Sequence, residues 1–236
     1  MSQLSDLKKE LRNVATEKKA KASSWFFKTG EGQYGYGDKF LGVTVPEQRQ
    51  IAKKFPDLTL VDIEKLLESA IHEERLTALF ILVGKYQKGS EELKKLIFEF
   101  YLTHMSRINN WDLVDSSAHK IVGDYIKDKK ITLLLSLAKS DVLWERRIAI
   151  VSTFAFLSEK NSKPTFAIAD ILLSDREDLI QKSVGWLLRE AGKQVSMKEL
   201  SDYLTKNYRK MGRTALRYAI ERFDGEERKK FLRGEV

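Results

Sequence analysis

Residues 178–192 read DLIQKSVGWLLREAG, and this stretch shows the pattern on which the fold depends. Its apolar residues recur at intervals of three and four, the period that places them on one face of an α-helix. The same period runs through VDIEKLLESAI at 61–71, ERLTALFILVGKY at 74–86, EELKKLIFEFYLTHM at 91–105 and WERRIAIVSTFAFL at 144–157. Because no stretch alternates convincingly like a strand, the sequence predicts an all-α fold.

The helices also follow a longer repeat. A basic residue opens each strongly apolar second helix at Arg75, Arg147, Lys182 and Arg213, with spacings of 72, 35 and 31 residues. If the first interval is two steps of about 36, a further unit lies near residue 111, where NNWDLVDSSAHKIVGDYI begins another helix. Such a period with two helices per unit is typical of HEAT or TPR arrays. Since the TPR signature residues are absent, we predict a HEAT-like solenoid.

We expect a single domain over 1–236, with an N-terminal helical segment and glycine-rich loop at 1–45 and the repeat array at 46–236. Stacked helix pairs produce a concave face lined by the second helices, and a basic concave face suits an extended polyanion. The four basic residues would then lie along one edge of that face. Alternatively they only solvate helix N-termini, although a cation there opposes the helix dipole.

Composition narrows the class of protein. The chain has 236 residues, a formal net charge of +8 and no cysteine, which excludes disulfide scaffolds, thiolate zinc sites and cysteine nucleophiles. Its three histidines, His72, His104 and His119, are scattered rather than set at metal-ligand spacing. We therefore expect no metal and no cofactor. No apolar run approaches the length of a membrane span, so we expect a cytoplasmic protein with no membrane partner. A solenoid of this size that wraps a polymer can work as a monomer.

Residues 30–35, GEGQYG, match the dinucleotide-binding pattern G-x-G-x-x-G, with Asp57 following at some distance. That motif requires a strand before the first glycine and a helix that begins at the third. Here the next helix is predicted to begin only near Pro46, and no second βαβ unit follows. We interpret the segment as a loop whose glycines allow sharp turns or a close approach of the backbone to its surroundings.

Trp111, Asp115 and His119 form a stripe along one border of an apolar helix face, because each lies about 40° from the previous one. The stripe is expected to be partly buried and still reachable, with Asn109 or Asn110 as the helix cap. For Asp115 the alternative to a functional role is a salt bridge to a neighbouring helix, for example through the arginines at 146 and 147. A tryptophan at such a position is more often part of the core.

Two further positions are candidates for nucleic-acid contacts. Arg146 and Arg147 are adjacent on an otherwise apolar helix, so one can face solvent while the other faces the groove. Arg147 is the candidate for a bidentate phosphate contact. Trp186 follows Lys182 by one helical turn, and an aromatic ring beside a cation can hold a sugar or a base. Equally, Gly185 and Trp186 can be a small–large packing pair.

Four segments together resemble a known family. In order along the chain they are WFFKTGEGQYGYGDKFLGVTVPEQR at 25–49, NNWDLVDSSA at 109–118, LWERRIAI at 143–150 and KSVGWLLREAG at 182–192. They are similar to segments of the bacterial DNA alkylation repair glycosylases of the AlkD type, which are built from HEAT-like repeats. The resemblance covers nearly the whole chain.

The resemblance implies a monofunctional glycosylase that releases cationic N3- or N7-alkylated purines from duplex DNA without flipping the base. It implies Asp115 as the catalytic carboxylate, Trp111 and Trp186 as aromatic walls against the deoxyribose, and Arg147 as a phosphate contact. Arg146, Lys182 and Arg213 are further candidates for contact with DNA.

Phe26 stands where some family members have a tyrosine; it can pack on DNA but cannot donate a hydrogen bond. His119 is expected to be structural or close to a phosphate. A non-catalytic protein of this fold that binds distorted or branched DNA is the second hypothesis, and a protein–protein scaffold is the third.

Overall fold

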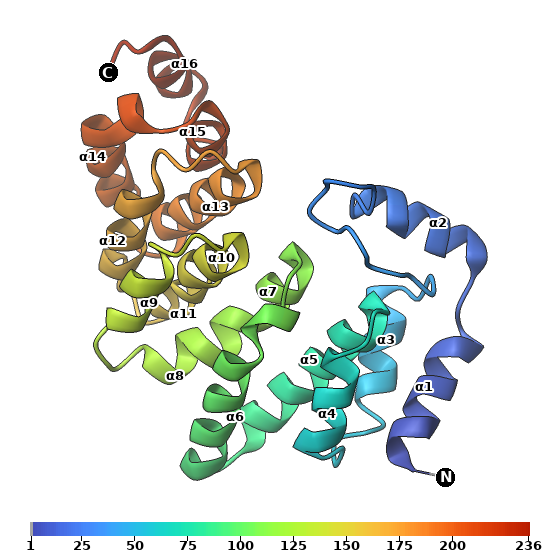
Figure 1. Ribbon diagram of the computed structural model, residues 1–236. Coiled ribbons are helices and arrows are strands. Elements are labelled where there is room, and N and C mark those ends of the chain that lie inside the picture. Colours follow the sequence, from blue (N-terminus) through green and yellow to red (C-terminus); the bar gives the residue numbers. More distant parts are fainter. Residues whose placement is uncertain (1) are drawn as a thin grey trace. The chain divides into compact units, whose positions relative to one another are not determined.

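The computed structural model describes residues 2–236 and divides into two compact units, Met1–Ser117 and Ala118–Val236. The described residues are helices and connecting loops, apart from one isolated backbone bridge between Lys39 and Ile71 (Figure 1). The predicted all-α class is therefore confirmed. That residues 1–236 act as a single domain, and that a basic face is concave, stay predictions.

The first unit is assembled around the long helix α5. Helices α1, α3, α4 and α6 all contact it (Figure 1). The elements are α1 (Gln3–Asn13), α2 (Glu17–Phe26), α3 (Val45–Ala52), α4 (Leu60–Leu67), α5 (His72–Lys88), α6 (Glu91–Thr103), the 3-10 turn η1 (Met105–Arg107) and α7 (Trp111–Ala118). Several begin where the sequence supplies a cap, as at Thr59 and Ser90, whose side chains accept N–H bonds of the first turn.

The second unit is a row of helix pairs. Its elements are the π-helical turn η2 (His119–Gly123), α8 (Asp124–Ile126), α9 (Thr132–Leu137), α10 (Leu143–Ser152), α11 (Phe154–Ser158), α12 (Lys163–Leu172), α13 (Asp178–Gln194), α14 (Met197–Asn207), the 3-10 turn η3 (Tyr208–Lys210), α15 (Arg213–Ala219) and α16 (Gly225–Arg233). The second helices α10, α13 and α15 begin at regular 35-residue steps, and each packs on the next (Figure 1). This nearest-neighbour packing is that of a helical repeat array.

The loops before α5, α10 and α13 share one hydrogen-bond pattern. In each loop, the residue three positions before the helix makes two hydrogen bonds. Its side chain accepts a bond from the backbone N–H of the residue two positions later in the chain. Its backbone carbonyl accepts a bond from the side chain of the residue six positions later. The side-chain acceptors are Ser69, Ser140 and Asp175, at 3.0, 3.0 and 2.9 Å, and the donors to the carbonyls are Arg75, Arg146 and Gln181, at 3.2, 2.9 and 2.8 Å.

This pattern corrects the predicted repeat register. Arg75 is equivalent to Arg146 and not to Arg147, and the equivalent residue in α13 is Gln181 rather than Lys182. Arg213 is the first residue of α15, which places it earlier in its helix than the others. The period was predicted well because it depends on the apolar faces. The basic residues were misaligned because adjacent polar side chains give no periodic signal.

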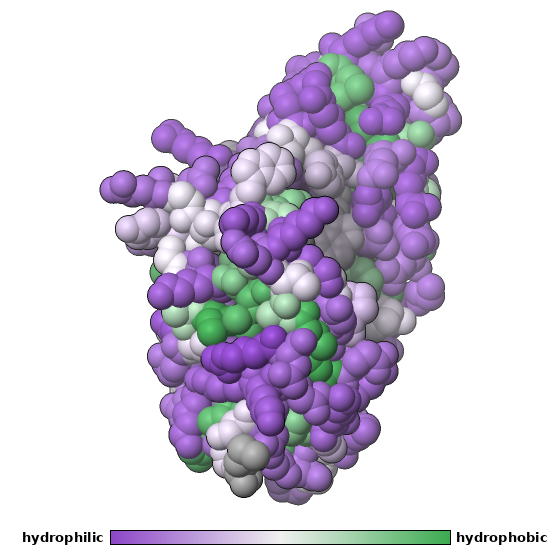
Figure 2. Space-filling model, turned by 90° about the vertical axis from the view of Figure 1, so that its right-hand side faces the viewer, coloured by the Kyte–Doolittle hydropathy of each residue, from purple (hydrophilic) through white to green (hydrophobic). Residues whose placement is uncertain are grey.

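The surface and the core follow the amphipathic pattern. Hydrophilic side chains predominate on the face shown in Figure 2, and apolar groups appear there as separated areas. The core contains mainly leucine, isoleucine and valine from the predicted apolar faces. In the described part of the chain no helix is both long and apolar enough to cross a membrane.

Gly185 is required where α13 crosses α15. A methyl group added at this position would lie 2.4 Å from the carbonyl oxygen of Ala215 and 2.5 Å from Cβ of Tyr218. Both neighbours are parts of the α15 backbone or its first side-chain carbon, so neither can rotate away. Gly185 is therefore a small residue at a close helix crossing, while its pairing with Trp186 as a small–large pair stays a prediction.

We expect Gly185→Ala to lower the free energy of unfolding by about 1–3 kcal/mol, because the helices must separate to admit the methyl group. Urea denaturation followed by circular dichroism measures the change. Gly225→Ala is the matched control in the same unit, since a Cβ there meets nothing within 4 Å. Equal stability of the two variants would show that the crossing tolerates a wider separation.

Candidate active site

The segment WDLVD at 111–115 begins α7, so two residues of the predicted stripe, Trp111 and Asp115, lie in the first two turns of this helix. The side chain of Asn110 caps the helix and accepts a bond from the N–H of Trp111 at 2.8 Å. Trp111 and Asp115 are both half-buried, so each remains reachable from solvent. His119 lies beyond the α-helix, in the π-helical turn that follows it. Such turns are rare and occur frequently beside functional sites.

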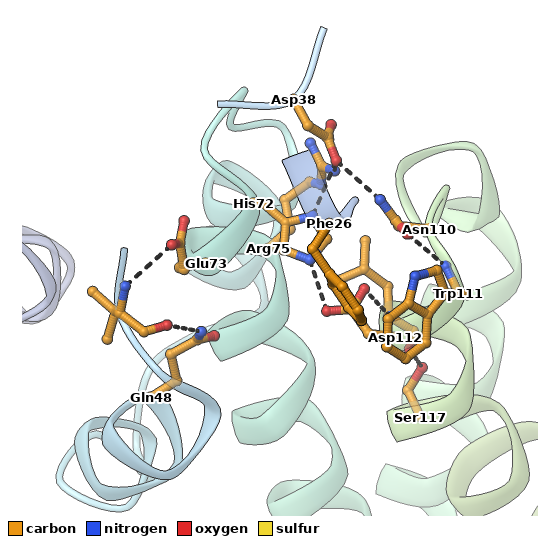
Figure 3. A network of polar contacts seen from close by, with 12 residues as sticks. Phe26, Asp38, Gln48, His72, Glu73, Arg75, Asn110, Trp111, Asp112 and Ser117 are labelled. Carbon is orange, nitrogen blue, oxygen red and sulfur yellow. Dashed lines mark hydrogen bonds and ion pairs between the residues drawn. The ribbon is translucent and has the colours of Figure 1, made fainter. Parts of the chain in front are cut away.

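A buried charge network holds the start of α7 (Figure 3). His72, the first residue of α5, lies between two carboxylates: its Nδ1 is 3.0 Å from Asp38 Oδ2 and its Nε2 is 2.8 Å from Asp112 Oδ2. The imidazole is 2% exposed and the two carboxylates 6% and 10%. Asp112 belongs to the first turn of α7, so this contact joins α7 directly to α5.

Two more side chains complete the network. Arg75 donates from Nη2 to both oxygens of Asp38, at 2.7 and 2.8 Å. The capping residue Asn110 donates to Asp38 Oδ2 at 3.3 Å (Figure 3). Burial alone would raise the pKa of the Asp38 carboxyl, but the bonds from His72 and Arg75 lower it overall. Asp38 is therefore ionised and stabilised by two cations.

The glycine-rich loop places Asp38 in this network. After Asp38 the backbone of Lys39 pairs with the start of α5, donating to Ala70 O at 2.9 Å and accepting from the N–H of His72 at 2.8 Å. The buried carboxylate of Glu73 then accepts the N–H groups of residues 41–43, at 2.8 to 3.3 Å. No strand precedes the loop and no helix begins at its third glycine, so it lacks the geometry of a dinucleotide site.

Aromatic rings surround the exposed side of the network. Trp111 stacks on Phe27 with ring centroids 5.3 Å apart and an interplanar angle of 16°, and Phe26 meets it edge-on at 5.9 Å. Phe27 and Phe40 each lie 4.8 Å from the His72 ring. Phe26 is 56% exposed, and Figure 3 shows it beside Trp111. Two separately predicted residues, Phe26 and Trp111, thus lie in one aromatic cluster.

Asp115 lies on the same helix, near a buried hydroxyl pair. Tyr101 from α6 bonds Ser117 at 3.0 Å, and Ser117 donates to Leu113 O at 2.6 Å. Burial and the negative charge of Asp115 raise the pKa of Tyr101, while its bond to Ser117 lowers it. Tyr101 is therefore a neutral phenol that ties α6 to the last turn of α7.

Trp186 lies in the second unit, half-buried on α13. Its ring is 6.1 Å from that of Phe154, which in turn lies 5.4 Å from His119. Trp186 therefore belongs to a second aromatic group, and no pattern in the sequence indicated that Phe154 is part of it. Gly185, the residue before Trp186, makes the close contact with α15. The indole of Trp186 therefore lies beside the point where α13 crosses α15.

The two adjacent arginines differ from expectation, since neither is exposed. Arg146 donates from Nε to Asp175 at 2.7 Å and from Nη1 to the carbonyls of Ser140 and Asp141. Arg147 is 5% exposed and donates from Nη1 to the carbonyl of Leu179 at 2.5 Å. The predicted split between a solvent-facing and a groove-facing arginine is therefore wrong, because both side chains bond loop or helix groups of the next repeat.

The other predicted basic residues are more accessible. Lys182 is 42% exposed and pairs with Asp178 one turn earlier. Arg213 is exposed and donates to the carbonyl of Leu232 at 3.0 Å. An exposed ion pair such as that of Lys182 contributes little to stability, so this side chain can exchange partners at low cost. Among the described residues no group of three histidines or carboxylates could hold a metal ion.

Residues that sequence reasoning missed are those of the charge network, above all Asp38 and His72. The available signal was weak: a run of glycines before Asp38 indicated a close approach without saying to what. Contacts made through an irregular loop leave no period in the sequence.

Asp38→Ala should lower the free energy of unfolding by about 3–5 kcal/mol, because it leaves Arg75 and His72 buried without their shared carboxylate. Urea denaturation at neutral pH tests this. Lys21→Ala, which removes an exposed ion pair in the same unit, should cause no measurable change. Since the pKa of Asp38 is lowered, its contribution is present above the usual carboxyl range and is lost on acidification. A wild type and variant with equal stability at neutral pH would contradict the assignment.

Comparison with known proteins agrees with this architecture. The solved structure described as a predicted DNA alkylation repair enzyme from Enterococcus faecalis superposes with a TM-score of 0.69 at 18% sequence identity, over 89% of this chain and 97% of that one. At that identity the likeness shows the fold. No curated protein matches the sequence. The family model described as DNA alkylation repair enzyme matches residues 7–223, and the chain therefore belongs to the family of DNA alkylation repair enzymes.

Proposed function

We propose that this protein is a DNA glycosylase that hydrolyses the N-glycosidic bond of cationic N3- or N7-alkylated purines in duplex DNA. The observation that carries the proposal is α7, where the family's WDxVD segment sets the Asp115 carboxylate one turn after Trp111, with both side chains reachable. Membership of the family supports alkylated DNA as the substrate. The glycosylase chemistry comes from the residue types on this helix.

The charge of the damaged base explains those residue types. Alkylation of a purine ring nitrogen leaves the base cationic, so it departs as a neutral molecule and needs no general acid. As the bond from C1′ to the purine nitrogen breaks, the deoxyribose gains oxocarbenium character. A fixed carboxylate and the negative face of an indole both stabilise such a cation. Asp115 and Trp111 supply these two groups.

Water completes the reaction. We propose that Asp115 orients a water molecule whose oxygen bonds C1′ while the purine leaves with the electrons of the broken bond. The bound oxygen then loses a proton to the solvent, and the products are the neutral free base and an abasic site. No cofactor takes part in this balance.

Selectivity can arise without base flipping. The cationic purine is already a good leaving group, so stabilisation of the sugar cation accelerates release of the damaged base far more than of a normal one. A pocket that reads the base, as flipping enzymes use, is then unnecessary. The support for this part is the family resemblance and the aromatic and acidic residues of α7.

Other predicted residues keep their roles as proposals. Trp186 would be a second aromatic wall for the deoxyribose, which its half-exposed indole permits. Arg147 would act on the phosphate side, although its burial makes it a fixed charge rather than a mobile one. Arg146 is held by Asp175, so its influence on DNA would be indirect. We propose that the protein acts as a monomer on double-stranded DNA in the cytoplasm, close to the nucleoid.

Asp115→Asn should reduce excision of 7-methylguanine from duplex DNA by about 10²- to 10³-fold, because one preorganised charge is lost from the transition state. Single-turnover base release with enzyme in excess measures the rate, and anisotropy of labelled duplex measures affinity. We expect affinity to change little. Asp128→Asn, an exposed position with the same charge change, is the control and should excise like the wild type.

No release by the wild type, despite salt-dependent binding to DNA, would overturn the glycosylase proposal. It would favour a protein of this fold that recognises distorted or branched DNA.

Lys182→Ala and Arg213→Ala should each reduce the slope of log affinity against log salt concentration by about one unit, since each removes one phosphate contact. Titrations of duplex DNA at several salt concentrations give the slope. Lys198→Ala on α14, also exposed, is the matched control and should leave it unchanged. An unchanged slope in both variants would place the contact with DNA elsewhere.

A further inference from the structure

The contacts of His72 require a particular protonation state. A neutral imidazole donates one hydrogen bond and accepts one, whereas an imidazolium donates two. Both ring nitrogens of His72 lie within 3.0 Å of a carboxylate oxygen, Asp38 on one side and Asp112 on the other. An ionised carboxylate only accepts, so both contacts are satisfied only when the ring carries two protons.

The surrounding charges agree with that state. Burial disfavours the charged ring, but Asp112 and Asp38 outweigh burial and the repulsion of Arg75, and they raise the pKa of His72 to about 9. These three residues are the charged groups that face the ring from the glycine-rich loop, α5 and α7. His72 is thus cationic at neutral pH.

Two routes lead from His72 to Trp111. The first runs through the backbone, because Asp112 directly follows Trp111 in the first turn of α7. The second runs through ring contacts, since Phe27 lies tilted on His72 at 4.8 Å and stacks on Trp111 at 5.3 Å. Asn110, the cap of α7, is bound to the same carboxylate as His72 (Figure 3).

We propose that the His72 imidazolium is a positioning residue, which fixes the first turn of α7 and thereby the orientation of Trp111 and Asp115 toward the substrate. The inference rests on the proposed glycosylase function for its effect on rate. Its structural part, that the charged ring orients Trp111, is independent of that function. His72 itself touches neither the reacting atoms nor the water.

The sign of the pH effect follows from the raised pKa. The two-carboxylate contact contributes fully below the ordinary histidine range and is lost as pH rises through about 9. A neutral ring can then donate to only one carboxylate, and its second nitrogen faces the other with a lone pair. We expect the start of α7 to loosen at that point.

Nuclear magnetic resonance tests the structural part directly. The indole ring C–H signals of Trp111 are assigned by their loss in Trp111→Phe, and they are followed from pH 7 to 10.5 together with the His72 ring signals. In the wild type the Trp111 and His72 signals should shift together with pH, with one apparent pKa near 9 for His72. In His72→Gln the indole signal should not titrate. If the chemical shift of the Trp111 indole does not change while His72 titrates, the proposal is overturned.

Asp112→Asn is the conservative variant that separates positioning from simple stability. Its amide can donate to a neutral Nε2 while Nδ1 of His72 still donates to Asp38, so the contact no longer needs the second proton. We expect the pKa of His72 to fall and the Trp111 signal to stay in its low-pH position up to pH 10. Thermal unfolding confirms that each variant is folded before it is compared.

Excision provides the second readout. At pH 8, His72→Gln should release 7-methylguanine about 10- to 100-fold more slowly than the wild type at saturating enzyme, with similar affinity for DNA. Above pH 9 the wild-type rate should fall relative to that of Asp112→Asn by about tenfold. The titration of the substrate itself is common to both proteins and cancels in this ratio.

The outcomes separate the two proposals. Identical pH profiles for the wild type and Asp112→Asn would overturn the positioning role. If the Trp111 signal follows His72 but no variant releases any base, His72 still orients Trp111 and the glycosylase proposal fails.

Discussion

The first unit depends on one interaction, the doubly donated contact of His72 with Asp38 and Asp112. It joins three segments far apart in the sequence: the glycine-rich loop, the start of α5 and the start of α7. Arg75 and Asn110 bind the same Asp38 carboxylate, so the loop cannot move without breaking several buried bonds. Because these groups are charged and buried, each needs the others as hydrogen-bond partners. We therefore expect the network to form cooperatively.

The second unit depends instead on repetition. The loops before α10 and α13 contain the same pair of hydrogen bonds. In each, the side chain of one loop residue accepts a backbone N–H, and the carbonyl of that residue accepts a bond from a side chain of the following helix. This explains a basic residue near the start of a helix, where the dipole disfavours it. Arg146 satisfies carbonyls that the tight connection would otherwise leave unbonded, and Asp175 neutralises it. Its charge therefore serves the fold first.

The features that could be predicted from the sequence are those that the spacing of apolar residues determines. The helices, their pairing and the 35-residue step follow from apolar faces, and the placement of Trp111 and Asp115 on one helix border follows from its turn. The partners of that helix could not be predicted, because Asp38 reaches it through a loop of turns and positive backbone angles. Arg146 and Arg147 could not be told apart for a related reason: which of two adjacent side chains meets the next repeat depends on helix rotation by about 100°.

The network also raises the question of why charged residues, rather than apolar ones, join α5 to α7. A buried ion pair seldom adds net stability over well-packed apolar side chains, because desolvation offsets the attraction, but it tolerates few geometries. An apolar contact between α5 and α7 would permit small rotations, whereas bonds of 2.8 and 3.0 Å to two ring nitrogens do not. A carboxylate that stabilises a short-lived sugar cation must be correctly oriented before the bond breaks. The charged network therefore serves orientation of α7 more than stability of the unit.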